Sequence, residues 1–367
     1  MIGTDIYYLL ALQKVKNIGD ISAKKLLRHF GSAKAVFEAA RKNQINVPEI
    51  GTVMTQSLKA FSDWKKVEQE IQFIEKNNIR IITIFDDEYP HKLFHAPDGP
   101  VLFFWKGNTS LSQQRIISIV GTRNMTAYGK RIVAELIEEL ARYKPLIVSG
   151  LAYGIDVEAH KNALKHNLPT IGVLGHGFQQ IYPGAHRKIA EMMLKNGGLI
   201  TEFWHSDPVD RVNFLKRNRI VAGMSEATII IESGTKGGSL VTADIANSYN
   251  RDVLAVPGRI NDKYSKGCNR LIKQNKAAIL TTAQDLAEML QWDIPEKVPP
   301  HRQLNLFVDL NDDEQKIFDL LQEKSKLSLD EIAIHLQFPV SKTAQLLLML
   351  ELNGIVQSLP GKTYELI

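Results

Sequence analysis

Residues 116–124 read Ile-Ile-Ser-Ile-Val-Gly-Thr-Arg-Asn, an apolar run that ends in a glycine turn. Similar short runs rich in Ile and Val recur along the chain, and helical stretches separate most of them. This alternation indicates an α/β fold whose parallel sheet is covered on both faces. The predicted strands are Ile79–Phe85, Ile116–Val120, Leu146–Ser149, Thr170–Leu174, Leu199–Phe203, Thr228–Ile231 and Val253–Val256. The predicted helices include Lys130–Ala141, Asp156–His166, Arg187–Lys195 and Leu240–Asn250.

Composition narrows the class of protein. The chain has 367 residues, of which 44% are hydrophobic, which predicts two or three domains and excludes wholesale disorder. The single cysteine, Cys268, excludes an intrachain disulfide and a cysteine-based zinc cluster, and favours a reducing, cytoplasmic location. The N-terminus lacks the pattern of a signal peptide, and no apolar run approaches the ~18 residues of a membrane span. We therefore expect no membrane association.

The chain divides into segments that differ in charge. Residues 1–75 read as helical and hold 11 basic and 8 acidic residues, whereas residues 76–293 alternate strands and helices and hold 27 and 21. Residues 294–308 contain three prolines and are predicted to be a linker. Residues 309–367 are predicted to be helical with a final hairpin, and residues 294–367 together hold 7 basic and 11 acidic residues. The basic surplus of the first two segments permits a nucleic-acid partner without requiring one.

The turns that follow the predicted strands are the candidate binding edge, because ligands of parallel sheets bind at the carboxyl ends of the strands. Glycine is frequent there and lets a ligand approach the backbone. A phosphate would meet backbone N–H groups together with the guanidinium of Arg123, unless that side chain pairs with a core carboxylate. Ser239 and Thr242 begin a predicted helix, whose N-terminus favours an anion. The turns are Gly121–Asn124, Ser149–Asp156, Gly175–Gly177, Gly234–Ser239 and Pro257–Arg259.

A second basic feature is the stretch Arg211–Ile220, in which four of ten residues are basic and none is acidic. Arg217 and Arg219 fall on different faces of a helix, so one can bind phosphate while the other serves structure. Phe214 lies among these cations, and such interleaving suits single-stranded nucleic acid, whose bases stack while its phosphates pair. The alternative is a solvated helix start with Phe214 in the core.

The first segment contains a glycine turn typical of a helix-hairpin-helix element at Asn17–Leu27, with a weaker echo at Glu49–Thr55. Asn17 stands where this element usually has its first glycine, and asparagine tolerates the left-handed conformation that the turn needs. Two such hairpins would pack as a tandem unit. The alternative is a helical bundle whose glycines only make turns.

The last segment reads as three helices and a hairpin, the order of a winged helix. The helices are predicted at Leu310–Gln322, Leu329–Leu336 and Val340–Leu352, and the hairpin strands at Gly354–Gln357 and Thr363–Leu366. Ser328 and Ser341 are the predicted N-caps of the second and third helices, and Glu331 completes a capping box with Ser328. The third helix carries Lys342 as its only cation, whereas helices that read duplex DNA are usually basic. We therefore favour a protein contact or a structural role for this segment.

Motifs for catalysis or cofactor binding are missing from the sequence. The turn at 121–126 lacks the later glycines of GxGxxG, and there is no GxxxxGK(S/T), HExxH or GxSxG pattern. His160, His176 and Asp156 resemble an acid–base group, but core hydrogen bonding explains them better. We expect no catalytic residue, no metal and no cofactor. The rival hypothesis is a Rossmann-like nucleotide phosphoribohydrolase, which has a glycine-rich turn vaguely like Lys236–Ser239.

An ordered series of motifs between about residues 115 and 285 resembles the DprA/Smf family of DNA-processing proteins. The motifs are Val120–Asn124, Tyr128-Gly129, Ser149–Asp156, Ala159-His160, Gly172–Gly177, Tyr182-Pro183, Arg217–Ile220, Gly238–Ala243, Ala255–Gly258 and Gly267–Ile272. The resemblance implies an extended Rossmann-like domain that binds single-stranded DNA, loads RecA recombinase, protects incoming strands during natural transformation and forms a homodimer. The usual FPxRNR sequence of the family has Leu215 in place of its proline here.

Together these observations predict three domains and one binding site. The domains are a helical helix-hairpin-helix or SAM-like domain (1–75), a Rossmann-like domain (76–293) and, after the linker, a winged-helix domain (309–367). Phe214 is the candidate for base stacking. The predicted contacts to DNA phosphates are Gly121, Thr122, Arg123, Asn124, Ser149, Gly150, Lys216, Arg217, Asn218, Arg219, Lys236, Gly237, Gly238 and Ser239.

Overall fold

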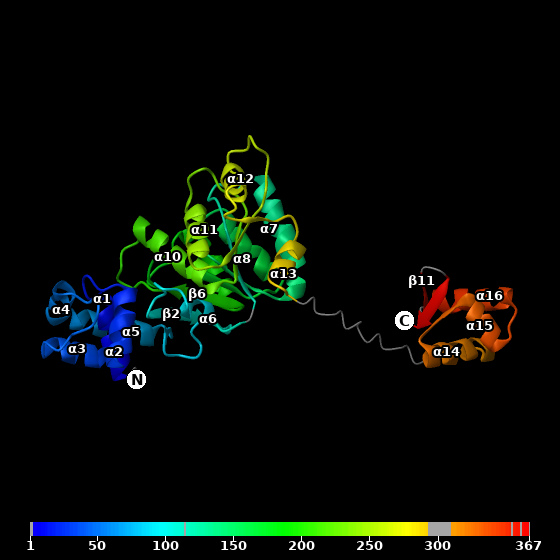
Figure 1. Ribbon diagram of the computed structural model, residues 1–367, viewed down its shortest axis with the longest axis horizontal. Helices are drawn as coiled ribbons and strands as arrows, with labels where there is room; N and C mark the ends of the chain where they lie inside the picture. Colours follow the sequence, from blue (N-terminus) through cyan, green and yellow to red (C-terminus); the bar gives the residue numbers. More distant parts are fainter. Residues whose placement is uncertain (1–2, 114, 293–309, 354, 360–361, 367) are drawn as a thin grey trace. The chain divides into compact units, whose positions relative to one another are not determined.

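A computed structural model describes residues 3–113, 115–292, 310–353, 355–359 and 362–366 (Figure 1). They form two compact units, one within Met1–Glu296 and one within Lys297–Ile367. The predicted linker at 294–308 lies outside the described residues. None of the helices in these ranges is long and apolar enough to cross a membrane.

A nine-stranded sheet forms the centre of the first unit, with the strand order β1-β2-β6-β5-β4-β3-β7-β8-β9. Strands β3 to β9 pair in parallel, which confirms the α/β prediction. The chain builds one half of the sheet from β3 through β6 and then returns to β7 on the other side of β3, so the strand order reverses there. The strands are β1 (Arg80–Thr83), β2 (Leu102–Gly107), β3 (Ile116–Val120), β4 (Leu146–Ser149), β5 (Thr170–Val173), β6 (Gly197–Thr201), β7 (Ala227–Ile230), β8 (Asp252–Ala255) and β9 (Ala278–Ile279).

The edge of the sheet differs from the prediction of a parallel sheet. β1 pairs antiparallel with β2, and β2 pairs antiparallel with β6. Only the four-residue helix α6 (His91–Phe94) lies between β1 and β2, so no long helix crosses a sheet face there as parallel pairing usually requires. Neither β2 nor the two-residue β9 was among the predicted strands.

Helices cover both faces of the sheet, as the alternating side chains of β3 show. Ile116 and Val120 belong to an apolar cluster with residues of α10, α11 and α12, whereas Ile117 and Ile119 pack with α7, α8 and α13. Successive strand residues point to opposite faces, so an all-apolar strand needs cover on both. The helices are α7 (Ala127–Leu140), α8 (Ile155–Lys165), α9 (Arg187–Met193), α10 (Arg211–Met224), α11 (Gly238–Ser248), α12 (Lys266–Lys273) and α13 (Ala283–Met289), with short 3-10 turns at Ala141–Tyr143 and Gly184–His186.

The N-terminal helices contain two turns of the same geometry. Asn17 and Glu49 have φ values of 64° and 66°, and two residues later Gly19 and Gly51 are the N-caps of α2 and α4. The Asn17 side-chain amide donates a 3.2 Å hydrogen bond to the Ser57 hydroxyl of the second hairpin, as expected for a tandem unit. The helices are α1 (Thr4–Lys14), α2 (Asp20–Phe30), α3 (Ala33–Arg41), α4 (Thr52–Lys59) and α5 (Trp64–Lys76).

The apolar core of these helices continues into the sheet. Leu102 and Phe104 of β2 and the buried Trp204 belong to the same cluster as Leu10 and Leu26. The helices and the sheet share one core, so the structure does not separate them at the predicted domain boundary between residues 75 and 76. That boundary stays a prediction.

The second unit has the winged-helix order. Ser328 and Glu331 form the predicted capping box, but the predicted cap Ser341 is wrong, because Pro339 precedes the helix and no side chain caps it. A short strand that the sequence reading omitted, β10, joins the hairpin as a three-stranded sheet. The elements are α14 (Asp312–Lys324), β10 (Lys326–Ser328), α15 (Leu329–Leu336), α16 (Val340–Leu352), β11 (Val356–Leu359) and β12 (Thr363–Leu366).

Candidate nucleic-acid interface

A groove of about 940 Å³ lies beyond the carboxyl ends of β3 and β7, where the strand order reverses. Doubly wound sheets bind ligands at such a position. The turns after both strands and the first half of α10 line it. It brings together most of the predicted site residues: Gly121, Thr122, Arg123, Asn124, Phe214, Arg217, Asn218, Lys236, Gly237, Gly238 and Ser239.

Arg217 is the central cation of this groove. Its side chain is only 5% exposed, yet it lines the groove and none of the described residues accepts a hydrogen bond from its guanidinium, whose Nε is buried. Burial lowers its pKa, and the nearby Asp156 carboxylate opposes that shift. A buried cation without a hydrogen-bond acceptor is costly, so this side chain is poised to receive an anion.

Arg123 and Phe214 form the aromatic part of the groove. The exposed Arg123 guanidinium lies 5.9 Å from the centroid of the Phe214 ring, and the Tyr182 ring lies 5.8 Å from it on another side. Phe214 also packs against Gly175, so the ring is half-buried. Phe214 therefore packs against the fold and also lines the groove, and its role in base stacking stays a prediction.

The glycines of the site serve two different purposes. A side chain at Gly121 would overlap Ile155, and a side chain at Gly154, whose φ is 80°, would overlap the Thr122 carbonyl, so both glycines allow α8 to pack on the β3 turn. Around Gly238, in contrast, the nearest heavy atom to an added methyl group would be 4.0 Å away. Only this second kind of glycine leaves space for a ligand.

The N-terminus of α11 opens into the groove. Gly237 is its N-cap without a side-chain cap, so the first N–H groups of this eleven-residue helix have no side-chain acceptor there. The Asn218 amide donates to the Gly238 carbonyl at 3.4 Å, and the Ser239 hydroxyl donates to Ser233 at 2.9 Å. These bonds hold the turn beside α10 and leave the helix N-terminus available to an anion.

Four predicted site residues do not line the groove. Arg219 is 6% exposed and its guanidinium binds Glu202 at 2.5 Å, Asp20 at 3.1 Å and the Asp98 carbonyl, which favours a structural role over the predicted contact with DNA. Lys216, at the surface, forms an ion pair with the same Glu202 at 3.1 Å. The remaining two residues, Ser149 and Gly150, are buried below the surface of the groove. The hydroxyl of Ser149 donates to the Ile119 carbonyl, and Gly150 lies behind Arg217.

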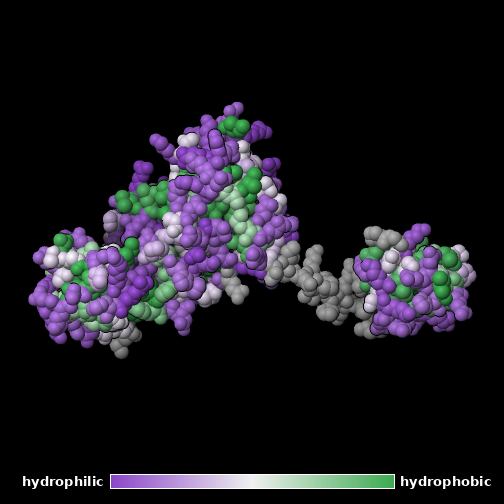
Figure 2. All heavy atoms as spheres, viewed as in Figure 1, coloured by the Kyte–Doolittle hydropathy of each residue, from purple (hydrophilic) through white to green (hydrophobic). Residues whose placement is uncertain are grey.

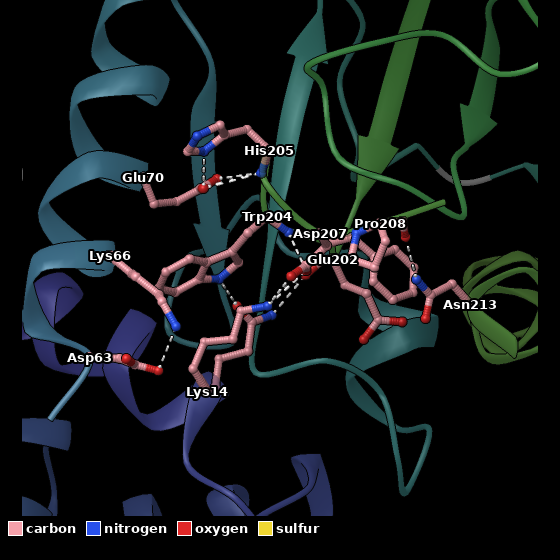
Figure 3. A network of polar contacts seen from close by, with 12 residues as sticks. Lys14, Asp63, Lys66, Glu70, Glu202, Trp204, His205, Asp207, Pro208 and Asn213 are labelled. Atoms are coloured by element: carbon pink, nitrogen blue, oxygen red, sulfur yellow. Dashed lines mark hydrogen bonds and ion pairs between the residues drawn. The ribbon is translucent and has the colours of Figure 1, made fainter. Parts of the chain in front are cut away.

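A polar network fixes the segment that leads into α10 (Figure 3). The ammonium of Lys14 binds Asp207 at 2.6 Å, and the carboxylate of Glu70 accepts hydrogen bonds from the backbone and the ring of His205. The Trp204 ring N–H donates to the Gln13 side chain at 2.7 Å. Residues of α1 and α5 thus hold residues 204–207, and thereby the start of the helix that carries Arg217.

Sequence reasoning missed several groove residues. Arg211 belongs to the predicted basic stretch, but it was not among the predicted contacts to DNA. Lys263, Tyr264 and Lys266 follow the carboxyl end of β8, where their position was a usable signal. Tyr182 was quoted only within a motif, and Asp156 was considered only as part of a motif and of an acid–base group. The groove is therefore more basic than predicted, with Asp156 as its acidic member.

The side chains of the candidate acid–base histidines form hydrogen bonds within the fold. His160 is fully buried between Thr170 and the Gly150 carbonyl, and burial lowers its pKa to about 4. His176 bonds the backbone at Gly177 and Tyr182. Burial also raises the pKa of the Cys268 thiol to about 12. Within the described ranges, no cluster of three or more His, Cys, Asp or Glu side chains is placed to hold a metal ion.

The second unit offers a different surface. Lys342 of α16 forms an ion pair with Asp313 at 2.5 Å, while Val340, Leu348 and Leu352 of the same helix are 53%, 55% and 73% exposed. Hydrophobic spheres accordingly appear on the surface of this unit (Figure 2). The helix that would read duplex DNA is therefore apolar and poor in free cations.

Comparison with known proteins identifies relatives over the whole chain. The family described as DNA recombination-mediator protein A matches residues 80–291, and the DprA winged helix domain matches residues 306–362. Protein Smf of Synechocystis sp. is 30% identical and aligns over 100% of both chains. DNA processing protein DprA of Bacillus subtilis is 38% identical over 68% of this chain and 85% of its own.

Two solved structures share the architecture. DNA processing protein A of Streptococcus pneumoniae covers 78% of this chain and 98% of its own, at 30% identity and a TM-score of 0.66. DNA processing protein A of Helicobacter pylori, described with a single-stranded DNA binding mode, covers 58% of this chain and 95% of its own, at 29% identity and a TM-score of 0.53.

Proposed function

The chain belongs to the DNA recombination-mediator protein A family, also named DprA/Smf, and on this premise we propose that it binds single-stranded DNA in the groove at the β3 and β7 ends. The observation that carries the proposal is Arg217, a buried guanidinium that lines a groove with five further cations and has no hydrogen-bond partner in the part of the chain that the structure describes. A phosphate would satisfy Arg217 and the N-terminus of α11 together. Phe214 and Tyr182 offer rings on which bases stack.

The first expected result concerns strand preference. The groove presents cations, backbone N–H groups and aromatic rings rather than paired donors and acceptors for base edges. Binding should therefore favour single strands, show little sequence preference and weaken as salt rises. Titrations of full-length protein with single- and double-stranded oligonucleotides over a salt series measure this. Equal or tighter binding to the duplex at the same salt would contradict the proposal.

The second expected result divides the work between the two units. Deleting residues 294–367 should leave affinity for single strands largely unchanged, because the groove lies wholly within the first unit and α16 lacks free cations. Fluorescence anisotropy of labelled oligo-dT with full-length and truncated protein checks this. The matched control is Lys342→Ala, which should also have no effect. Loss of binding on truncation would show that DNA binding depends on the second unit and would contradict the proposed site.

We further propose that the bound strand is protected and passed to RecA recombinase during natural transformation, in the cytoplasm, by a homodimer. The family name, recombination mediator, supports the RecA step. Two-fold dimers are the commonest closed assemblies, and two joined grooves would raise apparent affinity by effective concentration. RecA filament formation on coated single strands tests the transfer, and the solution mass at micromolar protein tests the dimer.

A non-enzymatic role is proposed over the rival nucleotide phosphoribohydrolase. Two candidate carboxylates near the strand ends are engaged in the fold: Glu232 accepts hydrogen bonds from the backbone and hydroxyl of Thr126 at 2.9 and 2.6 Å, and Glu202 binds Arg219. Release of free base from nucleoside monophosphates would favour the rival.

A further inference from the structure

Asp156 is the feature that a groove for phosphates does not explain. Among the described residues that line the groove, it alone is acidic, and it is 7% exposed in the first turn of α8. The lining cations are Arg123, Arg211, Arg217, Lys236, Lys263 and Lys266. A buried carboxylate in such a site would repel the ligand, so its presence needs a reason.

The surroundings of Asp156 point to Arg217. A methyl group at Gly150 would overlap both the Asp156 carboxylate and the Arg217 guanidinium, so the two charged groups meet over this glycine. Arg217 forms no hydrogen bond with Asp156 or any other described residue, and its charge is balanced only through space. Asp156 in turn accepts one long hydrogen bond from the backbone N–H of Ala152, at 3.4 Å.

The other groups around Asp156 leave its charge free to change. Arg123 faces it from the β3 turn, Arg217 from α10 and the Ser149 hydroxyl from the end of β4. His160 of α8 bonds the Gly150 carbonyl, and its pKa of about 4 keeps it neutral above that pH. His176 and His186 bond backbone carbonyls of the neighbouring turns.

Resting on the proposed function, we propose that Asp156 holds the place of a DNA phosphate at Arg217. In the free protein the carboxylate neutralises the buried guanidinium. A strand phosphate that takes Arg217 brings a second anion beside Asp156, and two neighbouring anions in a buried site disfavour each other. The proton that relieves this repulsion goes to Asp156, so strand binding takes up a proton from solution.

The sign of the pH dependence follows. Burial raises the pKa of Asp156 above its ordinary value, and the nearby Arg217 opposes this shift. A bound phosphate raises it further, so the complex holds more protons than the free protein. Affinity for single strands therefore rises as pH falls and declines as pH rises, beyond the change seen in a variant that cannot ionise here.

The test compares full-length wild type with Asp156→Asn, using anisotropy of labelled oligo-dT between pH 5.5 and 8. Asparagine keeps the size and the acceptor for Ala152 but removes the charge. At pH 7.5 it should bind about 3- to 10-fold more tightly than wild type, the size of a screened repulsion between neighbouring charges. The pH slope should shrink, and calorimetry in buffers of different ionisation enthalpy should show less proton uptake.

Two controls keep the inference separate from the proposed function. Glu158→Gln removes a buried carboxylate from the same turn of α8 outside the groove, and should keep the wild-type slope. Asp156→Ser serves if asparagine disturbs folding, which circular dichroism checks. An unchanged slope, or weaker binding at every pH by either folded neutral variant, overturns the inference while the proposed function stands. If wild type does not bind oligo-dT at all, the proposed function fails and the inference with it.

Discussion

Replacing Arg217 with alanine is expected to weaken binding to labelled oligo-dT by about 1–3 kcal/mol, the range for a hydrogen bond to a charged group. This side chain is buried, and no acceptor among the described residues binds its guanidinium, so a phosphate would supply a hydrogen-bond partner. Fluorescence anisotropy at fixed salt and pH measures the change. Arg123→Ala should act in the same direction, because Arg123 lines the same groove from the turn after β3.

The matched control is Arg131→Ala on α7, which removes an exposed arginine outside the groove. Its affinity should match that of wild type at the same salt. Thermal unfolding of each variant confirms that it is folded. If both groove variants bind like wild type, the DNA site lies elsewhere in the chain.

Arg219→Ala should have its largest effect on stability rather than on DNA binding. The substitution leaves the Glu202 carboxylate, whose side chain is 2% exposed, without its closest cation. Breaking a buried ion pair from one side typically costs about 3–5 kcal/mol. Urea unfolding of the first unit measures the loss, and the remaining pair between Lys216 and Glu202 lessens it.

Arg80→Ala provides the matched comparison, because Arg80 pairs with Glu88 at 2.7 Å at the surface. Surface pairs are worth about 0–1 kcal/mol, so this variant should unfold close to wild type. A stability loss for Arg219→Ala as small as that for Arg80→Ala would show that the buried network does not hold α10. Folded Arg219→Ala protein should retain most of its affinity for oligo-dT.

The contrast between Arg217 and Arg219 shows how far sequence reasoning reached. Helical geometry separates residues two apart, so the sequence predicted different roles for the two arginines. Which of them faces the groove depends on Asp20, 199 residues before Arg219 in the chain, and on Glu202 at the end of β6. Such distant partners leave no local pattern, so the sequence could not show that Arg219 lies outside the groove.

The fold itself was largely predictable, since β3, β4 and the helices α15 and α16 begin and end where their apolar patterns place them. The purpose of individual glycines was not. Gly121 follows a strand, as ligand-binding glycines do, but Ile155 occupies the space that its missing side chain leaves. Local sequence shows that a position tolerates no side chain without showing which neighbour forbids it.

The bonds between the N-terminal helices and residues 202–219 limit how far the chain can be shortened from its N-terminus. A protein trimmed to begin at β1 would lose Lys14 and Asp20, which bind Asp207 and Arg219, and Gln13, which binds Trp204. It would also strip the apolar cover from Leu102 and Phe104 of β2. We therefore expect the shortest fragment that folds on its own to start at α1, although the family match itself begins only at residue 80.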